Sequence, residues 1–341
     1  MKTPLLVFNN KGIYCEQAGV YLDPWKPVDK AIITHGHSDH SRWGHKQYIT
    51  HHDNIPIITH RLGEITVTGK KYNETFTING VKFSLYPAGH IIGSSQVRVE
   101  YKGEVWVFTG DYKIENDGIS TPYEPVKCHT FITECTFGLP AFNWTPQPIV
   151  YEAINNWWAE NQREGKTSVL FGYSLGKAQR ILHGLNPEIG KIYTHAAIEN
   201  MNEAIRPIVP LQHTHRITRD TTKQELKGNI VLAPPSVHGS PWIRKMVPFE
   251  TGSASGWMAF RGARRRRAID KGFVLSDHCD WNGLLTAIKA TEANKIITTH
   301  GYTDIFSKYL RTLGYDARTE KTQFEGEPVE GETVIETPTN A

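Results

Sequence analysis

The sequence predicts an α/β protein in which one domain is interrupted by another. Three observations lead to this prediction. The first 143 residues are rich in short strands with tight turns, residues 144–271 alternate strands with helices, and a second strand-and-helix pattern starts at residue 272. The length of 341 residues is enough for one large α/β domain or for two domains of ordinary size.

Short β-branched and aromatic runs, bounded by glycine, asparagine or proline, predict the strands of the first part. They occupy residues 5–9, 30–35, 81–87, 95–101 and 104–111. No apolar run approaches the ~18 residues of a membrane span, and the N-terminal apolar stretch is too short for a signal peptide. We therefore expect a cytoplasmic protein without a membrane partner.

The middle part has apolar residues at helical spacing from Thr145 onward. Helices are predicted at residues 148–166, 176–185 and 197–209, with a strand at 167–173. From Trp144 to Gly272 there are 18 basic against 10 acidic residues, whereas the rest of the chain has 20 basic against 25 acidic residues. This asymmetry predicts a polyanionic partner for the middle part.

The last part is predicted to contain two strands that alternate with two helices. They occupy residues 272–277, 281–293, 295–300 and 303–314. Residues 323–341 have five glutamates, no basic residue and few large apolar groups, so we expect a mobile tail. The four cysteines form no C-x-x-C pair, which predicts reduced thiols and neither a zinc ribbon nor a disulfide framework.

A cluster of metal-ligand side chains directly follows the strand predicted at residues 30–35. The segment "HGHSDH" begins at His35, and its glycine permits a sharp bend, so that His35 and His37 could bind one cation while Asp39 and His40 turn to a second. Imidazole nitrogens suit zinc, and a carboxylate oxygen is tolerated by zinc or manganese. A surface histidine cluster is the alternative.

Three further residues with metal-ligand side chains stand at or just after the ends of apolar strands. They are His90 in "PAGHIIGSS", Asp111 in "VFTGDY" and His300 in "IITTHGYTD". One strand-end histidine is more often a satisfied polar residue than a ligand. The combination of these residues with the cluster at residues 35–40 favours a metal centre.

These motifs resemble those of the metallo-β-lactamase superfamily, whose His-x-His-x-Asp-His loop is matched in full by residues 35–40. The resemblance implies a four-layer αββα sandwich and two divalent metal ions. Zinc is the expected metal, and manganese and magnesium are the alternatives. The resemblance also implies the ligands. They are His35, His37 and His90 for the first metal, Asp39, His40 and His300 for the second, and Asp111 as a bridge between both.

Further motifs resemble the β-CASP nuclease branch of this superfamily. Glu134 in "FITECTFG" is similar to its acidic first motif, His278 in "FVLSDHCDWNGLL" to its second motif and His300 to its third. The segment "YSLGKAQRIL" resembles part of the domain inserted in that branch. The resemblance implies a metallo-β-lactamase domain at residues 1–143 and 272–322, with a β-CASP insertion at 144–271.

Within this branch, "SGWMAFRGARRRRAIDKGFVLSDHCDW" is most similar to the bacterial ligase-associated DNA exonucleases. This implies a metal-dependent exonuclease that shortens single-stranded DNA ends during repair, 5′ to 3′ by analogy alone, with a DNA ligase and a helicase as partners. Two alternatives stay open. One is a ribonuclease of the same branch, because His300 is typical of RNA-processing relatives, and the other is a small-molecule metallo-hydrolase.

The expected chemistry is phosphodiester hydrolysis, in which two metals roughly 3.5 to 4 Å apart activate a water and stabilise the attacking and leaving oxygens. Asp39, Glu134 and His278 are the catalytic candidates. Glu134 could orient a ligating imidazole, and His278 could protonate the leaving oxygen. The alternatives are a structural acid at a strand end for Glu134 and a helix-capping or ligand-supporting role for His278.

Two segments of the middle part are candidates for binding nucleic-acid phosphates. The run "RGARRRR" has five arginines in seven residues, namely Arg261, Arg264, Arg265, Arg266 and Arg267. Ser174 and Lys177 flank a glycine at a predicted helix start, where free N–H groups attract anions. A solvated charge run and an ordinary helix cap are the respective alternatives.

Overall fold

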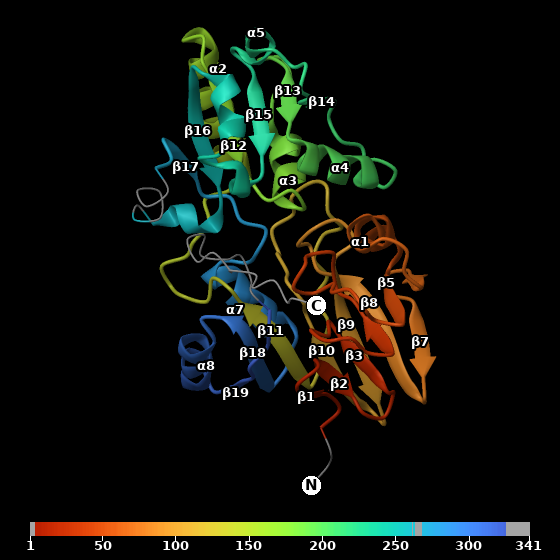
Figure 1. Cartoon of the computed structure of the whole chain (residues 1–341). Helices are drawn as coiled ribbons and strands as arrows, with labels where there is room; N and C mark the ends of the chain where they lie inside the picture. The colour runs from red at the N-terminus through yellow and green to blue at the C-terminus, as the bar shows by residue number, and fades with distance from the viewer. Residues whose placement is uncertain (1–3, 261, 263–267, 325–341) are drawn as a thin grey trace.

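The computed structural model describes residues 4–260, 262 and 268–324, and within them the predicted α/β class is confirmed. Figure 1 shows two bodies, one built from both ends of the described chain and one from its middle. The arginines predicted to bind phosphate, Arg261 and Arg264–Arg267, lie outside the described residues. None of the described helices is both long enough and apolar enough to span a membrane.

The first body contains two sheets that pack face to face. The six-stranded sheet has the order β1 (Val7–Phe8), β2 (Ile13–Cys15), β3 (Val20–Leu22), β4 (Lys30–Ile32), β5 (Gln47–His51), β6 (Val67–Lys70). The seven-stranded sheet has the order β19 (Asp316–Thr319), β18 (Lys295–Gly301), β11 (Thr130–Cys135), β10 (Glu104–Phe108), β9 (Ser95–Tyr101), β8 (Val81–Pro87), β7 (Thr75–Ile78). Ile13 and Ile32 of the first sheet share one core with Phe83 and Ile132 of the second.

Helices cover the outer faces of these two sheets. Side chains alternate between the faces of a strand, so Phe131 and Ile296 point away from the shared core and pack against α7 (Trp281–Ala290) and α8 (Thr303–Thr312). On the opposite side, Leu62 of α1 (Ile55–Leu62) packs near Ala31 and Tyr48. The layers of this body therefore run helix, sheet, sheet, helix.

The second body is a parallel sheet with helices against it. Its strand order is β14 (His215–Arg216), β13 (Ile192–Thr194), β15 (Ile230–Ala233), β12 (Thr167–Phe171), β16 (Phe249–Ala254), β17 (Lys271–Phe273). The described α-helices of this part are α2 (Gln147–Arg163), α3 (Lys177–Gly184), α4 (Ala196–Ile205) and α5 (Lys223–Leu226). Trp158 of α2 and Ile181 of α3 pack with Leu170 and Leu232 of the sheet.

Short 3₁₀ helices complete the described elements, and local signals fix several helix starts. The 3₁₀ helices are η1 (His52–Asn54), η2 (Pro235–Val237), η3 (Pro241–Met246) and η4 (Gly256–Ala259). Pro148 lies in the first turn of α2, where its missing N–H leaves no helical bond unmade. The Asp280 carboxylate accepts a hydrogen bond from Gly283 N at 2.7 Å and caps α7.

Several predicted strands end earlier than the sequence pattern indicates. The strands predicted at 81–87 and 95–101 match β8 and β9, whereas those at 30–35 and 104–111 end at Ile32 and Phe108. The strand predicted at 272–277 ends at Phe273 and completes the parallel sheet of the second body. Beyond it, the carbonyl oxygens of Leu275 and Ser276 accept hydrogen bonds from side chains of α3.

Phe324 lies in the segment that the sequence predicts to be a mobile tail, but it packs into the core. Phe324 is buried and stacks on the His40 ring, with 4.2 Å between ring centroids and 11° between ring planes. It also contacts Trp25 edge-on at 5.7 Å. An aromatic ring in an otherwise acidic segment is therefore part of the core, and residues 325–341 of the predicted tail lie outside the described residues.

Candidate metal centre

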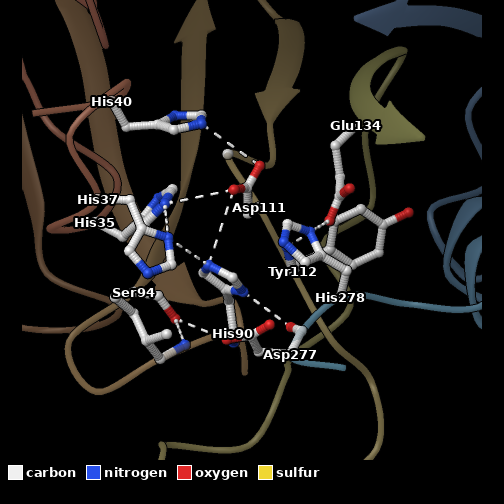
Figure 2. Close-up of polar contacts among 12 residues, drawn as sticks. His35, His37, His40, His90, Ser94, Asp111, Tyr112, Glu134, Asp277 and His278 are labelled. Atoms are coloured by element: carbon white, nitrogen blue, oxygen red, sulfur yellow. Dashed lines mark hydrogen bonds and ion pairs between the residues drawn. The ribbon is translucent and has the colours of Figure 1, made fainter. Parts of the chain in front are cut away.

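The centre forms where the carboxyl ends of several strands meet. Strands β8, β10, β11 and β18 point the same way in the seven-stranded sheet, and β3 and β4 run parallel in the other sheet. The loops that leave these strands carry metal-ligand side chains, which converge (Figure 2). The seven ligands predicted from sequence lie together here: His35, His37, Asp39, His40, His90, Asp111 and His300.

Three imidazoles and one carboxylate oxygen form a first group. His35 Nε2 lies 3.2 Å from His37 Nδ1, and His90 Nε2 lies 3.1 Å from the same atom. Asp111 Oδ2 is 3.5 Å from His35 Nε2 and 3.8 Å from His90 Nε2. One cation placed among these four atoms would replace contacts between ring nitrogens with bonds to a metal.

A second group lies on the other side of Asp111. His40 Nε2 is 3.5 Å from Asp111 Oδ1 and 3.6 Å from Asp39 Oδ2. His300 Nε2 is 2.9 Å from Asp111 Oδ1. The two carboxylate oxygens of Asp111 thus face different groups, which is the arrangement that a bridging ligand requires.

The bonding of buried atoms tests whether a cation fits this centre. Among the described residues, His40 Nε2, Asp111 Oδ1 and His300 Nε2 are buried and make no hydrogen bond of good geometry. Their contacts are ion pairs with one another, since Asp111 Oδ1 lies 2.9 Å from His300 Nε2 and 3.5 Å from His40 Nε2, and buried polar atoms are usually hydrogen-bonded. Imidazole and carboxylate donors suit zinc and tolerate manganese, and the residues present therefore fit divalent metals.

The ligand histidines are held from behind by hydrogen bonds at their other ring nitrogen. His35 Nδ1 lies 2.9 Å from Thr34 Oγ1, His37 Nε2 lies 3.2 Å from Leu175 O, and His90 Nδ1 donates to Asp277 O at 2.8 Å. Such bonds fix the tautomer and the ring orientation of a ligand. The supports of His37 and His90 come from distant segments of the chain.

Asp23 is a supporting residue that sequence reasoning missed. Its Oδ2 lies 2.7 Å from His40 Nδ1, and its Oδ1 accepts from Thr34 N at 2.7 Å. Asp23 directly follows β3, so the strand-end rule that identified Asp111 also applies to it. Although burial disfavours the charged form, Asp111, Asp39 and Asp23 raise the pKa of His40 to about 10.

Gly36 is required here by close packing and not by an unusual backbone angle. The φ of Gly36 is not left-handed. A Cβ at this position, however, would lie 2.5 Å from Ile57 Cγ2 and 3.0 Å from Asn54 Oδ1. The sharp bend expected at Gly36 therefore depends on the absence of a side chain, which lets this loop lie against α1.

Glu134 contacts a different histidine from the one expected. Its Oε1 lies 2.8 Å from His278 Nδ1 and also accepts from Tyr112 N at 3.1 Å. The nearest ligand imidazole, His300, is 3.9 Å from Glu134 Oε2, which is too far for a hydrogen bond. The structure therefore makes Glu134 the partner of His278 and not the orienting group of a ligand.

The pairing with Glu134 determines the charge of His278. Burial opposes the protonated ring, but the carboxylates of Glu134 and Asp111 outweigh it and raise the pKa of His278 to about 10. In contrast, burial and the neighbouring His40 lower the pKa of His35 to about 3. The pKa values of His35 and His278 are therefore shifted in opposite directions.

The centre opens into a cavity of about 520 Å³ between the two bodies. His37, Asp39, Asp111 and His278 line it from the metal side, and Arg61 lines it from α1. The second body contributes Tyr173, Ser174, Leu175, Ala197, Asn200 and Met201. A substrate in this cavity would contact both bodies at once.

The two nucleic-acid candidates at the start of α3 lie in different environments. Ser174 lines the cavity and remains a candidate for contacting phosphate. The prediction for Lys177 is wrong, because its ammonium is fully buried and lies 2.7 Å from Asp277 Oδ1. An anion outside the protein cannot reach a charge that is already paired in the interior.

The chain is similar to curated proteins that are much longer. No family model matches it. It is 28% identical over 323 residues to a protein of Opitutus terrae named probable DNA ligase, and the match covers 90% of this chain and 30% of that protein. It is also 32% identical over 124 residues to endoribonuclease ysh-1 of Neurospora crassa, covering 35% of this chain and 14% of that protein.

Two further proteins are similar to this chain, one in sequence and one in fold. Endoribonuclease YSH1 of Saccharomyces cerevisiae is 30% identical over 113 residues, which cover 33% of this chain and 14% of that protein. The chain therefore spans less than a third of each of these relatives. A solved structure of a protein of unknown function from Enterococcus faecalis V583 has a TM-score of 0.57 at 12% identity, covering 79% of this chain and 74% of that chain, which shows a shared fold alone.

Proposed function

We propose that this chain is a metal-dependent DNA exonuclease of the β-CASP branch of the metallo-β-lactamase superfamily, and that it shortens single-stranded ends during DNA repair. One observation carries the proposal. Two groups of buried metal-ligand atoms share Asp111 and lie beside a cavity large enough to admit a nucleotide. The centre would hold two divalent metals. Zinc is the metal we propose, and manganese and magnesium are the alternatives.

The fold and the order of the motifs support the family. A helix–sheet–sheet–helix body interrupted by a parallel α/β body supports the domains that we propose at residues 1–143, 144–271 and 272–322. One adjustment follows from the strands, because β17 extends the inserted body to Phe273. The names of the relatives, one a probable DNA ligase and others endoribonucleases, support an enzyme that acts on nucleic acid.

The chemistry is divided between the metals and the side chains of the chain. A metal pair held by the seven ligands would activate a water molecule and neutralise charge that develops on a phosphodiester. His278 lines the cavity, and the Glu134 carboxylate keeps it protonated, so we assign His278 as the donor of a proton to the leaving oxygen. Glu134 holds that ring in place, and Asp39 faces the second group as a ligand.

Action at an end is proposed from the resemblance to the ligase-associated exonucleases. Leu175 and Met201 line the cavity and also belong to an apolar cluster with Ile57 and Ile91, which joins the two bodies. The 5′ to 3′ direction is proposed by analogy with repair enzymes alone.

DNA is the proposed substrate because the relative that matches 90% of this chain is named a probable DNA ligase. That protein is more than three times as long as the matched region and is named a ligase, which supports a DNA ligase as partner, whereas a helicase is proposed from the family resemblance alone. The second candidate function is an RNA-processing ribonuclease. It is favoured by the endoribonucleases that match about a third of the chain.

A cytoplasmic location is part of the proposal. The four cysteines are buried and unpaired, as is usual for proteins in a reducing compartment.

Digestion of matched DNA and RNA oligonucleotides, labelled at either end, tests the assignment. The protein is loaded with Zn²⁺, Mn²⁺ or Mg²⁺ in separate reactions. We expect stepwise release of nucleotides from single-stranded DNA and a loss of this activity in Asp39→Ala and His40→Ala. His45→Asn is the matched control, because His45 is buried in the same body but bonds Val28 N, away from the centre.

The outcomes separate the candidate functions. Cleavage of RNA alone would contradict the DNA assignment and support the ribonuclease. Internal fragments without end-dependent products would contradict the exonuclease. If the metal-loaded protein cleaves neither polymer, it is not a nuclease.

A further inference from the structure

Helix α3 of the inserted body carries two buried cations that point at the loops of the metal centre. Lys177 is 0% exposed and Arg180 is 1% exposed. Burying a charge is costly unless it is paired and hydrogen-bonded, so two buried cations on adjacent turns of one short helix call for an explanation. Lys177 extends to the segment that carries His278, and Arg180 extends to that segment and to the one that carries His90.

Lys177 fixes the backbone group that holds His90. Its Nζ donates to Asp277 Oδ1 at 2.7 Å and to Leu275 O at 2.9 Å. The carbonyl oxygen of the same Asp277 accepts from His90 Nδ1 at 2.8 Å (Figure 2). The ammonium thus fixes the residue whose carbonyl directs His90 Nε2 toward the first ligand group.

Arg180 holds the same two loops by their backbone. Its Nη2 donates to His90 O at 3.0 Å and to Asp117 Oδ2 at 2.9 Å. Its Nη1 donates to Ser276 O at 3.1 Å and to Gln147 Oε1 at 3.0 Å. A guanidinium has the rigid fork that these divergent bonds need, whereas a lysine ammonium does not.

The start of α3 also lies directly on the centre. Gly176 has φ +86°, and a Cβ there would be 2.4 Å from Ile91 Cγ2 and 3.1 Å from Asp277 Oδ2. The carbonyl oxygen of Leu175 lies 3.2 Å from His37 Nε2. Two of the three histidines in the first group are therefore supported by the inserted body.

In the second group, the His40 ring is held from within the first body. His40 is held by Asp23, which belongs to the first body, and its ring is covered by Phe324 of the same body. Asp39 and His300 also come from that body. A substitution in α3 should therefore weaken metal binding by the first group and leave metal binding by the second group unchanged.

We infer that Lys177 and Arg180 are positioning residues through which the inserted body sets the metal affinity of the first group, His35, His37, His90 and Asp111. The inference rests on the metal centre proposed above. It assigns these cations to the ligand loops, so the inserted body acts on metal occupancy as well as on substrate binding.

Metal titration of the full chain tests this inference independently of nuclease activity. Arg180→Lys keeps the buried charge but loses the fork, and Lys177→Met removes the charge at similar size. Zn²⁺ binding is measured by competition with a chromophoric chelator, and ligand geometry by the absorption spectrum of Co²⁺. We expect one of two sites to weaken by about 10- to 100-fold and the other to stay within error.

Two controls distinguish positioning from general stability. Arg206→Met breaks the 2.7 Å pair with Glu199 inside the same body, away from the ligand loops, and should leave both affinities unchanged. The double variant Lys177→Met with Asp277→Asn removes both charges of the buried pair. Its thermal stability should recover relative to Lys177→Met, while the affinity of the first site should stay low.

Several results would overturn the inference. They are equal weakening of both sites, unchanged affinity in Arg180→Lys, or full recovery of metal binding in the double variant. If Lys177→Met does not fold, Arg180→Lys decides the question alone. A wild-type protein that binds two metals but cleaves no nucleic acid would contradict the proposed function and leave this test intact.

Discussion

At the scale of single residues, the centre depends on which atom of each side chain is engaged. His278 uses Nδ1 for Glu134, and His90 uses Nδ1 for Asp277 O, which leaves Nε2 of His90 for the first group. Residue type alone does not determine these choices, because either ring nitrogen can bind a metal or a proton. The hydrogen-bond partner of one ring nitrogen determines that the other nitrogen faces the centre.

Glu134→Gln tests the pairing with His278. The amide is nearly the same size but lacks the charge that keeps His278 protonated, so the proton donor weakens. We expect kcat for phosphodiester hydrolysis to fall by about 100-fold or more, with metal content unchanged. Metal analysis of the purified variant provides the check, since a loss of metal would show that Glu134 holds a ligand after all.

His45→Asn tests a buried histidine outside the centre. Burial lowers the pKa of His45 to about 4, below its unfolded value of about 6.5. The unfolded state therefore binds a proton first as the pH falls, and the stability that a neutral His45 contributes above pH 6.5 is lost between pH 6.5 and 4. In urea unfolding at pH 7.5 and pH 5, wild type should lose more stability than the variant.

The other histidines contribute equally to the loss of stability in both proteins, so the difference between the two losses reports on His45. Equal losses of stability in the two proteins would show that His45 titrates normally in the folded state.

At the scale of elements, the strands position the candidate ligands, and helix α3 contacts the loops that carry some of them. The loops after β4, β8 and β10 and the end of β18 carry the ligands, whereas α3 approaches from the other body. This approach needs Gly176 for two reasons. Its φ is +86°, and there is no room for a Cβ beside Ile91.

Gly176→Ala separates these two reasons when it is compared with Gly239→Ala. Gly239 has φ +73° but nothing within 4 Å of a Cβ, so alanine there costs only the backbone strain, about 1 kcal/mol. At Gly176 the clash adds about 1–3 kcal/mol. We expect a clearly larger fall in the free energy of unfolding for Gly176→Ala, measured by urea titration, and similar falls would contradict the close packing.

At the scale of the whole molecule, the centre lies where two bodies meet. The cavity takes its walls from both, and an apolar cluster that includes Ile57, Ile92 and Met201 joins them. Metal binding should therefore stabilise the assembled chain and not one body alone. The charged residues that face the cavity from the first body include Asp39, Arg61 and Asp111.

Metal removal tests this coupling. Ligand binding to the folded state alone contributes about 2.7 kcal/mol at a hundred times the dissociation constant. We expect EDTA to lower the Tm of wild type and Zn²⁺ to restore it. Asp111→Asn loses a charge that faces both groups, so its Tm should respond little to Zn²⁺ in the same scanning calorimetry.

A Zn²⁺ response of Asp111→Asn as large as that of wild type would show that Asp111 does not bridge. The His45→Asn variant should respond as wild type does, because its substitution lies outside the ligand groups.

The sequence by itself determined the α/β class and most element types, and it brought out the candidate metal-ligand residues. These features are local. Apolar periodicity sets strands and helices, and the candidate ligands either lie close together in sequence, as at residues 35–40, or lie at or a few residues after a strand end, as His300 and Asp111 do. The same local rule covers Asp23, which we did not identify from sequence.

Only the tertiary structure decided which charges are used inside the protein. Lys177 resembled an anion-binding residue, yet it pairs with Asp277, 100 residues away, and Glu134 pairs with His278, 144 residues away. No local pattern encodes such pairs, because they exist only once two bodies and two loops have come together. The physical reason is burial, since a charge removed from water must find its partner within the fold.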